Sequence, residues 1–275
     1  AINSADANGT IAIGYEAGKA ITSGGANTLI GYQSGLALTT SGNNVAIGYD
    51  SFKSAVDTCN SNISIGVQSM RYVDRGSNGS ATVNGNIALG YNALAGGDFG
   101  SSDKDLVGNI AIGKNALDAT GANAQTGTIA IGHEALTALT SGASNTAIGY
   151  QALLTATTAN QSVAIGYEAL KTTTTGLRNI AIGYEAMHDT DAGSSSSDSD
   201  NNIFIGYTAG GGAWANAKSE FNVAIGSNVM QGVLNGAVYN SALGYFALAS
   251  VTSGDKNVAV GSEAGYAITS ATNNT

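Results

Sequence analysis

The sequence predicts an all-β protein, a parallel β-solenoid or β-roll of about fourteen coils. Three observations predict this fold. A motif of the form N-T-A-I-G-Y-E-A-L recurs along the chain, it follows a basic 17-residue period, and proline is absent from the whole sequence. Short repeats of this kind stack, so that each coil contacts only its neighbours and the chain grows by adding coils. The repeat therefore predicts a single β-solenoid domain over residues 1–275.

The glycine of the I-G step fixes the register of the repeat. The fourteen glycines are Gly14, Gly31, Gly48, Gly66, Gly90, Gly113, Gly132, Gly149, Gly166, Gly183, Gly206, Gly226, Gly244 and Gly261. Six of the steps between them have the basic 17-residue length, and each of these six carries threonine at the eighth position after its glycine. Longer intervals are therefore interpreted as coils with insertions.

Two short strands are expected in each coil. Seventeen residues are too few for a helical hairpin, and the β-branched segment that ends at the glycine is typical of a strand. A second, shorter strand is expected in the threonine-rich half, as in Leu170 to Thr175. Parallel coils would then stack at about 4.8 Å.

Asparagine occupies the position four residues before the glycine in 11 of the 14 coils. These residues are Asn27, Asn44, Asn62, Asn86, Asn109, Asn145, Asn179, Asn202, Asn222, Asn240 and Asn257. Stacking would align them in an internal ladder whose amides bond to the coils on either side. The glycine after the strand would allow a sharp bend. We interpret both columns as structural and not as a binding motif.

The main strand carries apolar residues on both of its faces. Valine or isoleucine dominates three residues before the glycine, Ile, Leu or Val stands directly before it, and alanine lies between them in 11 of 14 coils. Because side chains alternate across a strand, we expect the Val and Ile rows to fill the interior and the alanine row to face outward. An outward stripe of small residues would let another chain approach closely, which predicts a homo-oligomer, and we expect a trimer.

Composition excludes several classes of partner. Only 11% of residues are charged, the net charge is −9, and no basic stripe exists, so we expect neither nucleic-acid binding nor attraction to anionic membranes. Apolar runs are far shorter than the roughly 20 residues needed to cross a bilayer, so we expect no membrane insertion. The single cysteine, Cys59, is interpreted as a free structural thiol, with an interchain disulfide as the alternative.

Three consecutive coils carry a resemblance to known families. They read N-T-A-I-G-Y-Q-A-L (145–153), S-V-A-I-G-Y-E-A-L (162–170) and N-I-A-I-G-Y-E-A-M (179–187). This pattern resembles the head repeats of trimeric autotransporter adhesins and, more closely, the longer Y-x-A-L repeats of bacteriophage tail fibres. The resemblance implies a left-handed parallel β-roll, three chains side by side, and a place in an attachment fibre. The 17-residue period and the long insertions depart from the adhesin pattern and favour the phage-fibre interpretation.

If the coils are a scaffold, ligand contacts belong in the insertions. The four insertions lie near residues 71–83, 95–108, 188–201 and 211–221. The third holds four carboxylates, Asp189, Asp191, Asp198 and Asp200, which are weak candidates for calcium ligands; a solvated loop is the preferred interpretation. The fourth holds the only tryptophan, Trp214, for which stacking on a sugar ring and packing on the coils are equally good hypotheses.

Two recurring columns could be mistaken for a functional site. Tyrosine follows the glycine in nine coils, which suits a carbohydrate-binding ladder less well than stacking along the sheet or an interface. Glutamate recurs one residue later, in Glu16, Glu134, Glu168, Glu185 and Glu263. Paired carboxylates can hydrolyse glycosides, but a residue repeated in register is typical of coil building. With only two histidines, His133 and His188, we expect no enzyme, no cofactor and no histidine-rich metal site.

The sequence therefore predicts a structural or adhesive fibre segment, most like a bacteriophage tail or attachment fibre. The protein would be extracellular, on a virion appendage or a cell surface, and would bind copies of itself and a host-surface glycan or protein receptor. A bacterial cell-surface adhesin head is the alternative. An ice-binding solenoid is a remote third hypothesis, which rests on the threonine columns.

Overall fold

The computed structural model describes residues 7–55, 59–73, 82–96, 105–120, 124–190 and 198–275. All regular structure in these ranges is β and no α-helix occurs in them, so the predicted parallel β-solenoid is confirmed. The contacts within the chain divide it into two compact units, residues 1–144 and 145–275. Each unit is described by itself.

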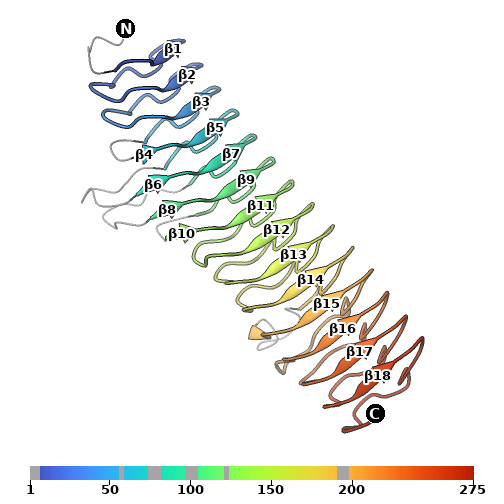
Figure 1. Ribbon diagram of the computed structural model, residues 1–275. Coiled ribbons are helices and arrows are strands. Elements are labelled where there is room, and N and C mark those ends of the chain that lie inside the picture. The colour runs from blue at the N-terminus through green and yellow to red at the C-terminus, as the bar shows by residue number, and fades with distance from the viewer. Residues whose placement is uncertain (1–6, 56–58, 74–81, 97–104, 121–123, 191–197) are drawn as a thin grey trace. The chain divides into compact units, whose positions relative to one another are not determined.

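Unit 1 contains a main sheet of seven parallel strands and a second sheet of four. The main strands are β1 (Ile11–Ile13), β2 (Thr28–Ile30), β3 (Val45–Ile47), β5 (Ile63–Ile65), β7 (Ile87–Leu89), β9 (Ile110–Ile112) and β11 (Ile129–Ile131). The second sheet contains β4 (Cys59–Asn60), β6 (Val83–Asn84), β8 (Leu106–Val107) and β10 (Gln125–Thr126). In both sheets the strands pair in chain order, one coil after the next (Figure 1).

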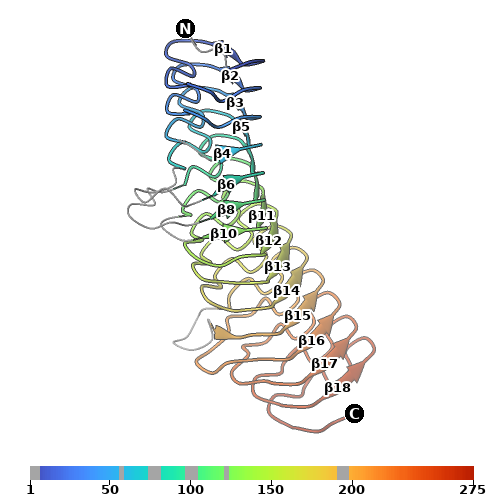
Figure 2. The same cartoon turned by 60° about the vertical axis from the view of Figure 1, so that its left-hand side comes forward.

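Unit 2 contains the other seven main strands, again parallel and in chain order. They are β12 (Thr146–Ile148), β13 (Val163–Ile165), β14 (Ile180–Ile182), β15 (Ile203–Ile205), β16 (Val223–Ile225), β17 (Ser241–Leu243) and β18 (Val258–Val260). Each strand lies on one side of its coil, and the chain returns to the sheet through a wide loop (Figure 2). Seven strands enclose six complete turns in each unit, about 12 in all, slightly fewer than the fourteen coils counted from the motif.

The expected second strand in the threonine-rich half is wrong for the 17-residue coils. Leu170 to Thr175 forms turns, and the nearest pairing is an isolated bridge between Asn160 and Leu177. Leu170 has a φ of 52°, a left-handed conformation that ends any extended segment. Short second strands occur instead in unit 1, directly before the asparagine column, where coils carry one or more extra residues.

Left-handed residues turn the chain at three positions of the coil. In the coil of Gly166 they are Gln161 (φ 56°), Glu168 (φ 52°) and Leu170 (φ 52°), and the same positions recur in other coils. Asn, Gln, Glu and Leu are strained in this conformation by a modest amount each. The stacked coils hold them in it, because the amide of Glu168 donates to Tyr150 O at 2.9 Å and that of Leu170 to Ala186 O at 3.0 Å.

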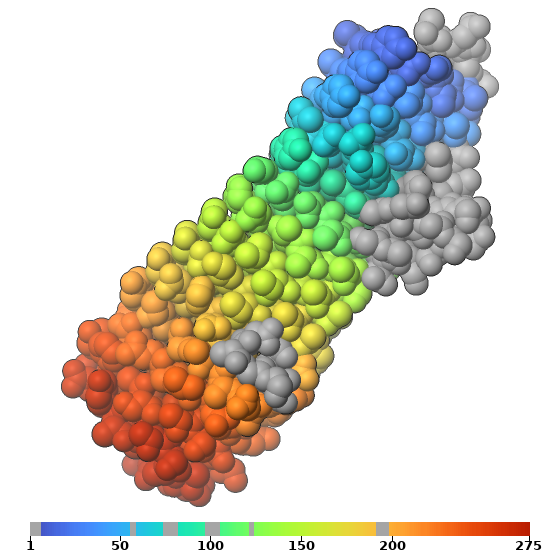
Figure 3. All heavy atoms as spheres, turned by 180° about the vertical axis from the view of Figure 1, so that it is seen from behind, coloured from blue at the N-terminus to red at the C-terminus, as the bar shows by residue number. Residues whose placement is uncertain are grey.

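The glycines of the I-G step are fixed by their neighbours in the stack. Gly183 has a φ of 139°, and a β-carbon added to it would lie 2.2 Å from the carbonyl oxygen of Gly206. Over both units, twelve of these glycines face the next coil in this way at 2.2–2.6 Å. Close coil-to-coil contact is visible over the surface of each unit (Figure 3). The glycine is therefore required by the approach of two backbones as well as by its dihedral angle.

The two faces of the main strands are the reverse of those expected. The central residue of the strand, usually alanine, is fully buried, as in Ala164 and Ala181, whereas Ile165 and Ile182 beside them are only partly buried. The interior at this level is already filled by the large residue four positions after the glycine, such as Leu170, which is also fully buried. Because the coil is narrow, the inward-pointing central position of the main strand has room for little more than a methyl group.

Two coils show this competition for interior volume directly. Where the central strand residue is large, as in Leu29 and Phe204, the position four after the glycine is itself glycine, Gly35 or Gly210. A β-carbon at Gly35 would lie 2.8 Å from Leu29 Cδ2, and one at Gly210 would lie 2.6 Å from Phe204 Cδ1. The two columns therefore share one cavity, and a large residue in one column requires a small residue in the other.

The asparagine column is inside both units, where every one of the eleven side chains is at most 1% exposed. Asn222 shows the pattern. Its Nδ2 donates to Asn202 Oδ1 at 3.1 Å and to Ala237 O at 2.8 Å, and its Oδ1 accepts from the backbone N–H of Asn240 at 3.0 Å. Thr128 and Ser162 take the same place in their coils, where their backbone N–H groups donate to Oδ1 of the preceding asparagine. The column thus bonds each coil to both of its neighbours.

Candidate functional site

The outer face of the main sheet has a uniform composition in each unit. It consists of the residues three before and one before each glycine, which gives 28 positions, and none of them is charged. In unit 1 these are Ile11, Ile13, Thr28, Ile30, Val45, Ile47, Ile63, Ile65, Ile87, Leu89, Ile110, Ile112, Ile129 and Ile131. In unit 2 they are Thr146, Ile148, Val163, Ile165, Ile180, Ile182, Ile203, Ile205, Val223, Ile225, Ser241, Leu243, Val258 and Val260. We call this surface the outer aliphatic face.

Eight aliphatic side chains of the outer aliphatic face are exposed, and the other aliphatic side chains are partly buried. Ile13 is 59% exposed in unit 1, and Leu243 is 50% and Val260 69% exposed in unit 2. In soluble monomers such residues are normally scattered singly, and a contiguous apolar patch usually marks a contact surface. The outward stripe of the main sheet is therefore formed by Val and Ile and not by alanine.

Tyrosines line the sheet one residue after the bend and stack on one another. Successive rings lie 5.1 Å apart in Tyr15, Tyr32 and Tyr49, and 5.1–5.3 Å apart in the series that begins at Tyr150 and ends at Tyr207. The rings are 8–14° from parallel, so each covers the face of the next. A sugar stacks on an exposed ring face, so this geometry favours the packing interpretation over a carbohydrate-binding ladder.

The glutamates beside the tyrosines are held in ionic contacts. Glu168 accepts a hydrogen bond from Lys171 Nζ at 3.0 Å and lies 2.9 Å from His188 Nε2. Burial raises the pKa of Glu168, but hydrogen bonds from Lys171, Tyr167 and His188 outweigh it and hold the pKa below its ordinary value. The hydrogen bond to the Glu168 carboxylate in turn raises the pKa of Tyr167. A carboxylate that stays ionised is a poor general acid, so Glu168 is not suited to that role.

Two further carboxylates lie in unusual surroundings in unit 1. Asp50 is 1% exposed, and its Oδ2 lies 3.1 Å from both Lys53 Nζ and Arg71 Nη2. Asp118 is half-buried; desolvation, followed by repulsion from Glu134, raises its pKa to about 6. The Asp50 cluster repeats the spacing of three residues between acid and lysine that is also present in Glu16–Lys19 and Glu168–Lys171, a signal visible in the sequence.

Trp214 lies inside unit 2 and not on its surface. The indole is fully buried, its Nε1 donates to Gly210 O at 2.9 Å, and its ring centroid is 5.7 Å from that of Phe204. A β-carbon at Gly210 would lie 2.6 Å from Phe204 Cδ1, so the glycine provides the space that the Phe204 ring needs. The geometry favours packing on the coils over contact with a ligand, because no ring face is open to solvent.

The acidic candidates for calcium are not gathered around a common point. Asp198 contacts the hydroxyl of Thr175 and lies 3.6 Å from Lys218 Nζ, while Asp200 accepts from the backbone N–H of Leu177 at 2.7 Å. The backbone carbonyl of Asp189 accepts from Trp214 N, and Asp191 lies outside the described residues. Within the described ranges no three His, Cys, Asp or Glu side chains are close enough together to hold a metal ion.

The remaining candidates take part in coil-to-coil contacts. Cys59 lies in β4 with none of its surface exposed, a position that suits a structural thiol better than an interchain disulfide. The hydroxyls of Thr22, Thr157 and Thr252 donate to carbonyl oxygens one coil away at 3.1–3.3 Å. These donors are therefore already used within the protein and are not presented as a free array to ice.

No protein-family model, curated protein or solved structure matches this chain. No helix among the described residues is long and apolar enough to cross a membrane. The outer aliphatic face is therefore the candidate functional site on the strength of its own geometry.

Proposed function

We propose that this chain is a structural segment of an extracellular fibre, in which copies associate side by side through the outer aliphatic face. The functional analogy is a bacteriophage tail or attachment fibre, on the basis of the Y-x-A-L repeat. The observation that carries the proposal is a row of 28 positions without a charge on the exposed side of a β-sheet. Solvent-facing sheets ordinarily carry polar residues on such a face.

The size of the outer aliphatic face supports a stable contact. At roughly 50 Å² of accessible surface for each of fourteen side chains, one unit would bury on the order of 700 Å² per copy, close to the roughly 800 Å² of a typical stable interface. Burial at about 25 cal/mol per Å² gives a favourable term large enough to offset the entropic cost of association. Three copies are favoured by the resemblance to trimeric adhesin heads, with the aliphatic rows of all three meeting at a common axis.

Light scattering coupled to size-exclusion chromatography tests the proposal. The native chain is expected to elute with three chain masses, and a variant with Ile182→Lys and Ile225→Lys is expected to elute as a folded monomer with an unchanged circular dichroism spectrum. Lysine at either position would bury an unpaired charge in the interface. Ser253→Lys, at an exposed turn position, is the matched control and should leave the trimer intact. A native chain that stays monomeric at micromolar concentration would overturn the proposal.

The adhesin alternative shares the same assembly and differs in what the assembly is attached to. Electron microscopy with an antibody against the chain separates the two, because a tail fibre would be labelled on virions and an adhesin on cells. A glycan or protein receptor for the fibre also stays a proposal. Its place would be in the insertions, three of which contain residues outside the described ranges.

A further inference from the structure

We propose that copies of this chain associate parallel and in register, and that three hydroxyl-bearing positions of the outer aliphatic face, Thr28, Thr146 and Ser241, specify that register. This inference rests on the proposed self-association and goes beyond it, because it names the partner's orientation and the residues that choose it. The other 25 positions of the face are aliphatic.

A uniform aliphatic face needs such a device. Successive coils present nearly the same Val/Ile pair at a constant step, so a copy displaced by one coil would bury almost the same surface. Register in β-structures is weakly specified wherever the pattern is uniform. A few polar positions in an apolar seam are the best-attested means of fixing register, at some cost in stability.

The three hydroxyls are spaced so that few displacements match them. Thr28 is on the second of the seven main strands of unit 1, and unit 2 carries Thr146 on its first strand and Ser241 on its sixth. In register, each hydroxyl meets the same hydroxyl of the other copies, and these groups can bond to one another. After a slip of one coil in unit 2, Ser241 would face Val223 or Val258, and its hydroxyl would be buried without a partner, which is costly.

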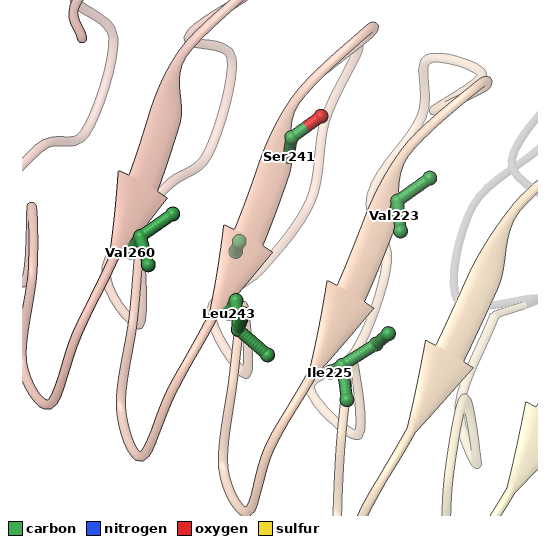
Figure 4. A pocket seen from close by; sticks show the side chains of 6 residues that line it. Val223, Ile225, Ser241, Leu243 and Val260 are labelled. Carbon is green, nitrogen blue, oxygen red and sulfur yellow. The ribbon is translucent and has the colours of Figure 1, made fainter.

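Ser241 also leaves a hollow in the outer aliphatic face. The hollow has a volume of about 200 Å³ and is lined by Val223, Ile225, Ser241, Ala242, Leu243 and Val260. Figure 4 shows the short serine side chain between longer aliphatic ones on the neighbouring strands. On strands that carry valine or isoleucine three residues before the glycine, where β17 carries Ser241, that longer side chain occupies the equivalent space.

The occupant of this hollow is a side chain of a second copy, and Leu243 of that copy is the one that fits an in-register assembly. In register, Leu243 of one copy meets Leu243 of the next at the level of this hollow, which Leu243 of each copy also lines. Leu243 is 50% exposed and is the only leucine on the outer face of unit 2. None of the described residues that line the hollow is charged, which argues against an acidic or basic segment as its occupant.

Cysteine cross-linking of the full-length chain tests the register. In a Cys59→Ala background, two differently tagged chains carry Ile165→Cys or Ile182→Cys, which lie on adjacent strands and away from the three hydroxyls. In register, the thiol introduced at position 182 pairs with the same thiol of another copy, whereas a pair between positions 165 and 182 forms only after a slip of one coil. The same-level product is expected to exceed the offset product by about tenfold, the ratio set by one unpaired buried hydroxyl.

Replacing the hydroxyls should remove this preference. In a variant with Thr28→Val, Thr146→Val and Ser241→Val, the ratio is expected to fall toward one while light scattering still shows the oligomer. The control variant has Val45→Ile, Val163→Ile and Val258→Ile, which change the same rows without removing a hydroxyl, and should keep the native ratio. If the valine variant gives the same ratio of same-level to offset product as the native hydroxyls do, the register proposal is overturned and self-association is unaffected.

Two other outcomes separate the proposals. An oligomer in which neither pair cross-links, or in which the offset pair dominates, would contradict the parallel in-register arrangement alone. A native chain that is monomeric by light scattering would overturn the proposed function itself, and with it the register proposal.

Discussion

At the scale of single residues, the asparagine column is the main polar device of the fold. Where asparagine also occupies the preceding coil, the amide bonds to the coil before it and to the coil after it from a buried position, as Asn222 does. The cost of losing such a group lies mainly in the partners that it leaves behind, because a buried donor or acceptor without a bond destabilises the fold by more than the bond stabilised it.

Asn222→Ala is expected to lower the free energy of unfolding by roughly 2–4 kcal/mol, because the carbonyl of Ala237 and the amide of Asn240 lose their partners. Chemical denaturation followed by circular dichroism measures the change. Asn216→Ala, at an exposed position of the same unit, is the control and should change stability by less than about 0.5 kcal/mol. Equal effects of the two substitutions would contradict the ladder's role.

Asp118 predicts a pH dependence of stability. Its pKa in the folded protein is raised to about 6 from an ordinary value of 3.8, first by desolvation and then by Glu134. The folded state therefore binds the Asp118 proton more tightly than the unfolded state does. The contribution of this group to the free energy of unfolding is fully present below pH 3.8 and is lost as the pH rises through 6. Asp118→Asn should raise the free energy of unfolding by about 1 kcal/mol at pH 8, after allowance for partial exposure, and leave it unchanged near pH 3.5. Denaturation at the two pH values measures this, and an equal gain at both would contradict it.

At the scale of elements, glycine at the bend after each main strand meets two requirements: a positive φ and the close approach of the next coil. Gly113 has a φ of 133° and its absent β-carbon would lie 2.3 Å from the carbonyl oxygen of Gly132. Gly108 also has a positive φ, 67°, but has open space where a β-carbon would be. Gly108 therefore shows the cost of a left-handed backbone alone, whereas Gly113 combines a φ that side chains rarely adopt with the close approach of the next coil.

Gly108→Ala is expected to cost about 1 kcal/mol, the strain of a left-handed alanine, whereas Gly113→Ala should cost more than about 4 kcal/mol because the stacked backbones must separate. The midpoint of urea denaturation of the two single variants measures the difference. Similar costs would contradict the strict requirement for glycine that the bend and the stacked backbones together impose at Gly113.

The sequence was sufficient for the fold class and insufficient for the direction of the side chains. A strong 17-residue repetition, without proline, identifies stacked coils, and it aligns the asparagine and glycine columns correctly. The inner and outer faces were reversed because hydrophobicity alone favours the larger residue inside. The sequence did contain a corrective signal: Leu29 occurs with Gly35 and Phe204 with Gly210, which is expected only if both columns share one interior.

The second strand was misplaced for a related reason. Residues such as Leu170 adopt left-handed conformations that β-propensity does not anticipate, and the stacked neighbours impose them. The sequence contains a sign of these left-handed positions, because glycine, which adopts positive φ without strain, replaces the usual residue in other coils. Gly18 is equivalent to Leu170, and Gly85 is equivalent to Gln161. The ionic contacts of Glu168 and Asp50 could be found only in part, because His188 and Arg71 reach them from the next coil.

At the scale of the whole molecule, self-association links stability to protein concentration. Any partner that binds only the folded state stabilises it by mass action. The outer aliphatic face would then contribute to thermal stability only in the assembled protein, and its contribution would disappear on dilution.

The thermal midpoint of the native chain is therefore expected to rise by several degrees between about 1 and 100 μM. The variant with Ile182→Lys and Ile225→Lys should show a midpoint that does not depend on concentration. Differential scanning calorimetry over this range measures both. A native midpoint independent of concentration would indicate that the aliphatic face stays exposed in solution.

The asparagine column has a consequence for how such a chain can change in length. Bonded members of the column lie 17 to 24 positions apart in the sequence, yet in each pair the later amide donates to the earlier asparagine at 3.0–3.2 Å. The bonds of the ladder thus depend on the stacking of the coils and not on the number of residues between successive asparagines. Deleting residues 163–179 would join equivalent points of two neighbouring coils and leave each remaining rung with a rung to bond. Duplication or deletion of a whole coil would then leave the asparagine ladder intact, so related chains could differ in length by whole coils.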